Sequence, residues 1–174
     1  MNDEESEFLL VIGDKISSSW SMRAWLMLKQ TGVAFEEKTI QLGTAYTKAE
    51  ISKYSPSGKV PLLKHNGLMV WESLAIGEYL NELFPEAKLW PQDQAAQAHA
   101  RCISNEMHAG FPILRKLMPF APNKTRTIGI TPELDADIKR LEEIWTSIEI
   151  YIQKLGLTFS GNLQLPMRCL RLWC

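Results

Sequence analysis

Three consecutive serines stand between an apolar run and a helical pattern. Ser17, Ser18 and Ser19 follow Phe8–Ile12 and precede a helical pattern over about residues 20–31. A β-α unit generally places its ligand at the N-terminus of the helix, where a hydroxyl and the helix dipole favour thiolate over thiol. Because no histidine lies near these serines in sequence, we expect a hydrogen-bond donor rather than a nucleophile. The plainer alternative is a loop with a helix cap.

The dipeptide Val60-Pro61 stands at the head of a second apolar run. Proline cannot donate to a strand ladder and restricts the residue before it, so one interpretation is simply a proline that starts a strand. The sharper interpretation is a cis bond, which only about 5–6% of X-Pro bonds adopt. A cis bond here turns the N–H and C=O of Val60 out of the sheet, where they form a backbone clamp for a peptide-like ligand.

Glu72 and Ser73 separate the apolar run Leu68–Trp71 from an amphipathic pattern that extends to Phe84. At such a junction the first N–H groups of the helix and the positive end of its dipole favour a carboxylate or a phosphate. The alternative is that one of the two side chains only caps its own helix, and the spacing by itself favours that alternative.

The elements that position these residues read β-α-β-α-β-β-α over about residues 8–84. A strand over 8–12 and a second strand within 35–42 are expected to be parallel, because a helix separates them. A short helix over 47–53 comes next. Asn66-Gly67 between two apolar runs is the strongest short-range signal for a two-residue hairpin.

Beyond a linker the strand signals end and helical patterns begin. We expect one long helix from Gln92 to about Met118. A second helix starts at Thr131-Pro132-Glu133, where a capping hydroxyl, a first-turn proline and an early acid coincide. It carries an apolar stripe at helical spacing, made of Leu134, Ile138, Leu141, Trp145, Ile148, Ile152 and Leu155.

The composition excludes several classes of protein. The 174 residues include 19 Lys+Arg and 20 Asp+Glu, and the resulting net charge of −1 offers no positive field for nucleic acid. No segment approaches the roughly 18 apolar residues of a membrane span, and the acidic N-terminus does not resemble a secretory signal, so we expect a cytoplasmic protein. The three cysteines and three histidines lack metal-ligand spacing, so we expect no metal.

Two sequence blocks resemble the glutathione transferases. The first is Ser-Pro-Ser-Gly-Lys-Val-Pro-Leu-Leu at 55–63, and the second is Trp-Glu-Ser-Leu-Ala-Ile-Gly-Glu-Tyr-Leu at 71–80. The two blocks in this order, with the element order and the helical remainder, are jointly specific, and the resemblance covers about residues 8–155. The Ser-Ser-Ser-Trp-Ser-x-Arg stretch is similar to serine-type subgroups, among them the theta and zeta classes and their bacterial relatives.

The resemblance implies a role for the segment that contains Ser17, Ser18 and Ser19, called the serine loop below. Ser18 matches the serine that stabilises the thiolate of glutathione, with Ser17 and Ser19 as alternates one residue away. Glutaredoxins share this fold and carry cysteines in that loop, so the serines exclude a thiol-disulfide mechanism there.

The resemblance also implies contacts for the rest of glutathione. Lys59 matches a side chain that meets the glycine end, Val60 the backbone clamp on the cysteinyl moiety, and Pro61 the cis-proline. Glu72 and Ser73 match the site for the γ-glutamyl group.

The fold class implied is an α/β thioredoxin-like N-terminal domain followed by an incomplete all-α C-terminal domain. We assign residues 1–84 to the first, 85–92 to the linker and 93–174 to the second. In this family the long helix borders the acceptor pocket and the dimer cleft, which makes His108 and Phe111 candidates for the acceptor pocket. A helical histidine by itself is more often a surface or interface residue.

The function implied is conjugation of glutathione, as co-substrate, to a small electrophile in detoxification, by a cytoplasmic homodimer. One alternative is a glutathione-dependent isomerase of the zeta type, in which glutathione adds and leaves again. Another is a glutathione-fold binding or interaction protein without turnover. No nucleic acid, membrane or metal is expected as a partner.

The segment after Leu155 departs from the family pattern, which continues with a Ser/Thr-x-x-Asp capping box. Residues 159–174 show no amphipathic period and carry two late cysteines. Reading each codon from the last base of one and the first two of the next permits Phe-Gly-Lys-Phe-Thr-Ile-Ala-Asp-Ala-Met-Phe-Ala-Pro-Val-Val, which restores the family segment. We therefore interpret the tail from about residue 157 as truncated and frameshifted. A naturally divergent short tail is the alternative.

Overall fold

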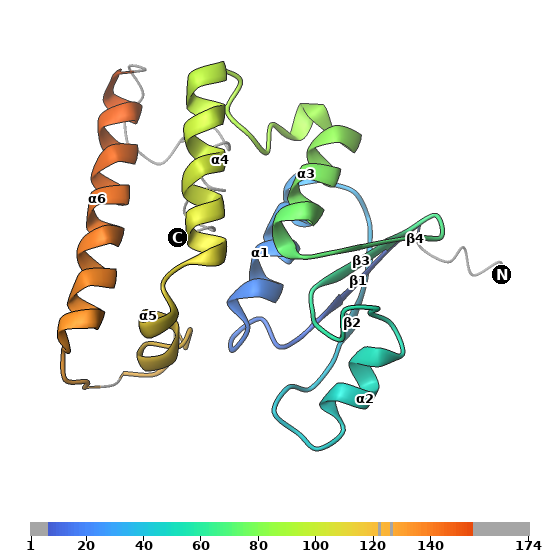
Figure 1. Ribbon diagram of the computed structural model, residues 1–174. Helices are drawn as coiled ribbons and strands as arrows, with labels where there is room; N and C mark the ends of the chain where they lie inside the picture. The colour runs from blue at the N-terminus through green and yellow to red at the C-terminus, as the bar shows by residue number, and fades with distance from the viewer. Residues whose placement is uncertain (1–6, 122, 126, 155–174) are drawn as a thin grey trace, which may run out of the picture. The chain divides into compact units, whose positions relative to one another are not determined.

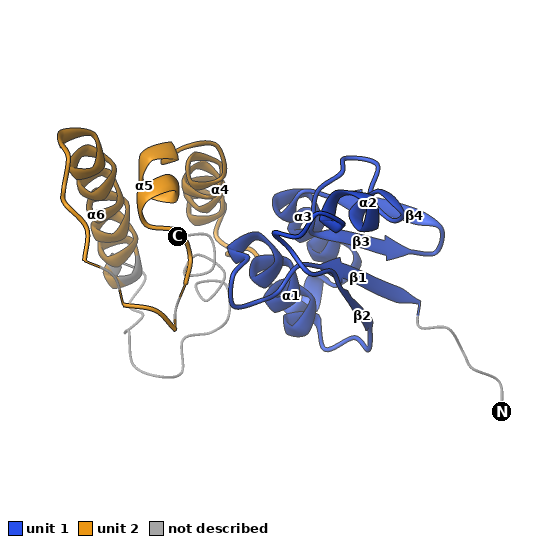
Figure 2. Cartoon of the chain, turned by 90° about the horizontal axis from the view of Figure 1, so that it is seen from below, with its two compact units in different colours: residues 1–89 blue, residues 90–174 orange. Residues whose placement is uncertain are grey.

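The computed structural model describes residues 7–121, 123–125 and 127–154. The atypical tail and the hypothesis of a frameshift therefore lie outside the described residues. The chain divides into two compact units, residues 1–89 and residues 90–174 (Figure 2).

The first unit has the predicted order β-α-β-α-β-β-α (Figure 1). Its elements are β1 (Phe8–Ile12), α1 (Ser19–Thr31), β2 (Glu36–Thr39), α2 (Thr47–Ser52), β3 (Leu62–His65), β4 (Leu68–Trp71), α3 (Ser73–Leu83) and the 3-10 turn η1 (Pro85–Ala87).

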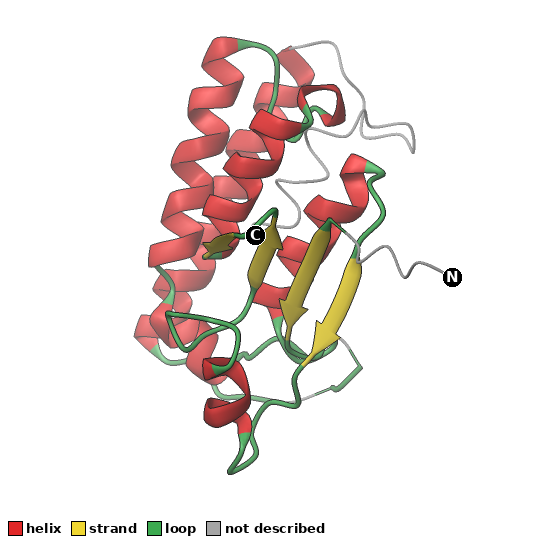
Figure 3. Ribbon diagram, turned by 90° about the vertical axis from the view of Figure 1, so that its right-hand side faces the viewer, coloured by secondary structure: helices red, strands yellow, loops and turns green. Residues whose placement is uncertain are grey.

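The four strands form one mixed sheet in the order β2-β1-β3-β4. Figure 3 shows the strands in yellow. β1 pairs in parallel with β2, as the intervening helix predicts, and β3 is antiparallel to both β1 and β4. β1 is therefore a central strand, consistent with its nearly continuous apolar sequence and burial. This arrangement confirms the thioredoxin-like fold of the first unit.

Residues on the two faces of the sheet alternate along the strands. On one face Val11 and its register partner Leu62 pack with Ile40 and with Ile51 of α2. The intervening residues Leu10 and Leu63, also paired and fully buried, belong to the opposite face. Helices α1 and α3 pack against each other on that side, and α2 lies on the other (Figure 1).

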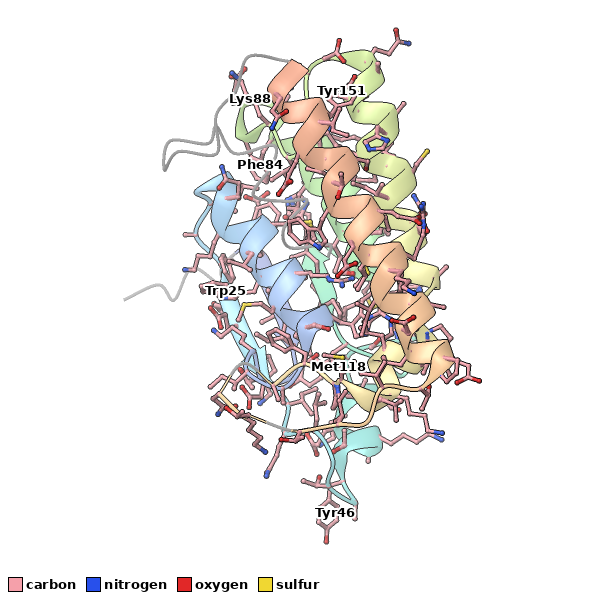
Figure 4. All side chains as sticks on the ribbon, turned by 90° about the vertical axis from the view of Figure 1, so that its left-hand side faces the viewer. Trp25, Tyr46, Phe84, Lys88, Met118 and Tyr151 are labelled. Atoms are coloured by element: carbon pink, nitrogen blue, oxygen red, sulfur yellow. The ribbon has the colours of Figure 1, made fainter. Side chains whose placement is uncertain are left out.

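The side chain of Tyr46, just before α2, is exposed and projects away from the ribbon (Figure 4).

The predicted hairpin joins β3 to β4. Asn66 has φ of 47° and Gly67 has φ of 80°, so both central residues adopt the left-handed conformation of a type I′ turn. The turn fixes the register in which Leu63 pairs with Val70.

The second unit is helical in its described part, with α4 (Gln94–Ala109), α5 (Pro112–Leu117) and α6 (Pro132–Lys154). Asp93 caps α4 by accepting a hydrogen bond from Ala96 N at 2.8 Å. The Thr131 hydroxyl accepts from Leu134 N at 3.3 Å, which is the predicted cap of α6.

The prediction of one long helix from Gln92 to Met118 was wrong. Gly110 ends α4, Phe111 adopts φ of 62°, and Pro112 opens α5, so Phe111 lies between helices. Proline supplies no N–H and disfavours helical backbone at the residue before it. Arg115, which we also placed on the long helix, instead belongs to α5 and donates to the carbonyls of Gly110 and Met107.

The apolar stripe of α6 is buried in part. Leu134 and Ile148 are buried, and so is Ile144, which the stripe did not include. Ile150 is exposed. Among the described residues, none of the helices combines the length and apolar character that crossing a bilayer requires.

We expect Gly67→Ala to lower the free energy of unfolding by about 1–2 kcal/mol, because a Cβ is disfavoured in the left-handed conformation. Among the described residues, no atom other than those of Gly67 and its two chain neighbours lies within 4 Å of a Cβ built at Gly67, so the cost is one of backbone conformation and not of crowding. Urea denaturation measures it. Gly129→Ala is the matched control, with equally open space and no positive φ. Equal losses in the two variants would contradict the assignment of the turn.

Candidate functional site

The register of the sheet brings the three sequence candidates to one edge. Val11 near the end of β1 pairs with Leu62 at the start of β3, which in turn pairs with Trp71 at the end of β4. The chain just after β1, just before β3 and just after β4 therefore lies along the same edge. These positions carry the serine loop, Val60-Pro61 and Glu72-Ser73.

The serine loop is built around Asp14. Its carbonyl accepts from Ser18 N at 2.8 Å and from Ser17 N at 3.3 Å, and its side chain accepts from Ile16 N at 2.9 Å. This tight turn delivers Ser18 to the N-cap of α1, with φ of −117°. The N-terminus of α1, which carries the partial positive charge of the helix dipole, therefore lies at this edge.

Ser18 is paired with Ser21 by two hydrogen bonds. The Ser18 Oγ accepts from Ser21 N at 3.3 Å, and its hydroxyl donates to Ser21 Oγ at 3.0 Å. Ser21 Oγ also accepts from Gly13 N at 2.9 Å. Ser18 is 8% exposed and Ser21 is fully buried, so this pair anchors the loop to the end of β1.

The two alternates differ from Ser18 in their surroundings. Ser17 is exposed, and Ser19, the first residue of α1, is half-buried. The three serines therefore differ in burial although they are consecutive. Of the three, only Ser18 caps the helix.

The Val60-Pro61 bond is cis, as the sharper interpretation predicted. Pro61 is buried and directly precedes β3, whereas Val60 before it is half-buried. Lys59 beside them is exposed, and its N–H donates to Ser57 Oγ at 3.3 Å. This segment thus presents backbone groups and a cation at the edge where the serine loop lies.

Glu72 and Ser73 form a strained junction with an unpaired hydroxyl. Glu72 has φ of 67° and ψ of 126°, a conformation that a residue with a side chain rarely adopts, and its side chain makes no capping hydrogen bond. Ser73 is fully buried, and its Oγ has no hydrogen-bond partner in the described part of the chain. The alternative that the side chain of Glu72 or Ser73 only caps helix α3 is therefore not supported.

The electrostatics of the edge favour an anion. α1 and α3 both begin there, and each helix N-terminus carries a partial positive charge. The ammonium of Lys59 adds a full charge. Two helix N-termini and one ammonium group at a single edge are an arrangement that favours the binding of acidic groups.

A polar cluster ties the serine loop to β2. Glu37 forms an ion pair with Lys15 at 2.7 Å and accepts from Trp25 Nε1 at 2.6 Å. Partial burial acts to raise the pKa of Glu37, but the hydrogen bonds from Lys15 and Trp25 outweigh it and hold the pKa below its ordinary value. The Lys15 ammonium also lies 4.6 Å from the centre of the Trp25 ring.

The two acceptor-pocket candidates belong to the second unit. His108 is half-buried in the last turn of α4, and Phe111 is buried just after that helix. Their assignment to an acceptor pocket stays a prediction. Within the described ranges, no three His, Cys, Asp or Glu side chains are grouped so as to hold a metal ion.

Sequence reasoning overlooked Ser21 and Asp14. The signal for Ser21 is its spacing, since a residue three positions after an N-cap is the one whose N–H the cap receives. Asp14 directly precedes the loop, and a short polar side chain that accepts from a backbone N–H two residues on is typical of a turn.

Residues 17–83 match the family described as glutathione S-transferase, N-terminal domain. The chain is 40% identical over 101 residues to a probable maleylacetoacetate isomerase of Caenorhabditis elegans, a match that covers 58% of this chain and 46% of the relative. The chain spans about half the length of the curated relatives it matches first.

Solved structures show similar folds. A Burkholderia glutathione transferase homologue with bound glutathione is 31% identical, with a TM-score of 0.54 over 63% of this chain and 60% of that one. A glutathione S-transferase from the Antarctic clam Laternula elliptica is 20% identical, with a TM-score of 0.66 over 97% of this chain and 74% of that one.

We expect Ser73→Ala to raise the free energy of unfolding of the free protein by about 1 kcal/mol, because a buried hydroxyl without a partner is costly. Ser21→Ala is the matched comparison, since Ser21 is equally buried but bonded, and we expect it to lower that free energy by about 1–3 kcal/mol. Chemical denaturation distinguishes the two. A loss of stability in both variants would show that Ser73 is satisfied in the free protein.

Proposed function

Because this chain belongs to the glutathione transferase family, we propose that it binds glutathione at the edge of the sheet and activates its thiol. The observation that carries the proposal is the buried hydroxyl of Ser73 at the N-terminus of α3, beside the strained Glu72, since this hydroxyl has no hydrogen-bond partner within the described ranges. In the free protein this edge already holds an unsatisfied donor and a strained backbone, both of which are costly. Such features are typical of a site that binds a ligand.

Each part of glutathione has a proposed partner. The α-carboxylate of the γ-glutamyl group accepts from Ser73, and the Glu72 carboxylate accepts from the ammonium of the same group. The N–H and C=O of Val60, directly before the buried Pro61, pair with the cysteinyl backbone. Lys59 meets the glycine carboxylate. The bound glutathione in the Burkholderia homologue supports this ligand.

The proposed reaction starts with loss of the thiol proton to solvent. The thiolate is stabilised by the N-terminus of α1 and by a serine hydroxyl, which we assign to Ser18 with Ser17 and Ser19 as alternates. The sulfur then attacks a small electrophile. A carbon–sulfur bond forms, and either a leaving group departs with its electron pair or the adduct takes a proton from water.

A second candidate function is a glutathione-dependent isomerisation of the zeta type. The 40% identity to a probable maleylacetoacetate isomerase favours it. The thiolate adds to a conjugated double bond, the intermediate rotates about the resulting single bond, and the thiolate leaves again, so glutathione is regenerated. Both candidates share the same first step at the same edge.

The assembly and location of the protein are also part of the proposal. We propose a cytoplasmic homodimer, in keeping with the family. The edge strand β4 exposes the apolar side chains of Leu68, Met69 and Trp71, which is the kind of surface that a second copy covers. His108 and Phe111 are proposed to border the acceptor.

Product analysis with glutathione distinguishes the candidates. A conjugate that accumulates in proportion to glutathione consumed indicates a transferase. Isomerised product with glutathione unchanged indicates an isomerase. Binding of glutathione without either product indicates a binding protein.

We expect Ser73→Ala to weaken glutathione binding by about 1–3 kcal/mol, because the ligand carboxylate loses a buried donor. Isothermal titration calorimetry measures the affinity. Ser104→Ala is the control, since Ser104 is also fully buried in a helix and its Oγ is also unpartnered within the described residues. Unchanged affinity in Ser73→Ala would disprove the γ-glutamyl assignment.

We expect Ser18→Ala to raise the pKa of the bound glutathione thiol by about 1 unit, because only the thiolate needs that hydrogen bond. The affinity for S-methylglutathione, which cannot ionise, should change little. Thiolate absorbance titrated against pH measures the pKa. A rise found only in Ser17→Ala or Ser19→Ala would move the assignment by one residue.

A further inference from the structure

We propose that Ser21 is a positioning residue that controls the Ser18 hydroxyl, through a hydrogen-bond relay from Gly13 N–H to Ser21 Oγ to Ser18 Oγ. The inference rests on the proposed function, in which Ser18 stabilises a thiolate. It adds a residue that does not itself touch the ligand, and it assigns the regulation of thiol activation to a buried pair.

The Ser21 hydroxyl is used as an acceptor and keeps its own proton free of these contacts. Ser21 Oγ accepts two hydrogen bonds, from Gly13 N at 2.9 Å and from the Ser18 hydroxyl at 3.0 Å. Its own proton is not used in either. Ser21 N also donates to Ser18 Oγ at 3.3 Å, so the two residues are linked in both directions.

In the free protein the Ser18 proton is directed at Ser21 and not at the edge of the sheet. A thiolate is an ionised acceptor, and hydrogen bonds to ionised groups are roughly twice as strong as neutral ones. When the thiolate binds, the Ser18 proton turns to the sulfur. Ser18 Oγ then becomes an acceptor, and the unused proton of Ser21 turns to it.

The relay that results runs from Gly13 N–H through the two hydroxyls to the sulfur. Hydrogen bonds in such a chain polarise one another, so Ser21 strengthens the bond that Ser18 donates. Gly13 directly follows β1, and the carbonyl of the same peptide group, that of Ile12, accepts from Ile40 N at 2.8 Å beside β2. The relay therefore begins at a rigid point of the sheet.

The competing explanation is structural. Ser21 would then only satisfy the buried N–H of Gly13 and fix the start of α1. A structural role changes stability and changes affinity for any glutathione analogue, whereas the relay changes the thiol pKa. The relay also acts only through Ser18, so the effects of the two substitutions on the thiol pKa must not add.

The test is a double-mutant cycle on the thiol pKa, read as thiolate absorbance against pH. We expect Ser21→Ala to raise the pKa by about 0.5 unit, which is roughly a threefold lower thiolate fraction at a fixed pH below both values. The double variant Ser18→Ala with Ser21→Ala should have the pKa of Ser18→Ala alone. Affinity for S-methylglutathione should stay within twofold of the parent in all variants.

Two variants complete the design. Ser104→Ala removes an equally buried helical hydroxyl of the second unit and should leave the thiol pKa unchanged. If Ser21→Ala does not fold, Ser21→Cys replaces it, because a thiol still accepts from Gly13 but donates weakly. The Cys contribution to absorbance is subtracted with S-methylglutathione as the ligand.

Additive effects of the two substitutions, or a thiol pKa in Ser21→Ala equal to that of the parent, would overturn the relay while leaving glutathione activation intact. Failure of the proposed function has a different signature. In that case the unsubstituted protein neither binds glutathione nor lowers the pKa of its thiol, and the relay falls with it.

Discussion

The placement of β3 between β1 and β4 is the constraint on which the rest of the first unit depends. Val11, Leu62 and Trp71 form one row across the sheet, so the segments that adjoin them must meet at one edge. A shift of one residue in the register of β3 would move the side chains of the buried Leu62 and Leu63 each to the other face of the sheet. The demand for a buried apolar core therefore decides where the polar residues of the site lie.

Two fully buried serines at that edge differ in whether their hydroxyl groups have hydrogen-bond partners. Ser21 is satisfied by Gly13 and Ser18, and it fixes the loop. Ser73 is as deeply buried and has no partner among the described residues. Because an unmet buried hydroxyl destabilises the free protein, its presence favours a ligand that supplies the missing acceptor.

Sequence reasoning succeeded where local chemistry decides the outcome. Asn66 and Gly67 specify their turn by backbone preference alone, and the apolar run of β1 specifies a central strand. It failed at Phe111, where an Ala-rich helical pattern outweighed the restriction that Pro112 places on its neighbour. It overlooked Ser21, because the N–H of Gly13, eight residues earlier, meets the Ser21 hydroxyl only when the end of β1 and helix α1 pack together.

The residues proposed to hold glutathione all belong to the first unit, while those proposed for the acceptor belong to the second. Thiolate formation, which the transferase and isomerase candidates share, then depends on the edge of the sheet and on the buried pair of Ser18 and Ser21. The later bond-forming step depends on which electrophile reaches the thiolate. The proposed activating edge around Pro61 and Ser73 serves the step that both candidate reactions have in common, so one fold can serve different reactions through changes in the residues proposed for the acceptor.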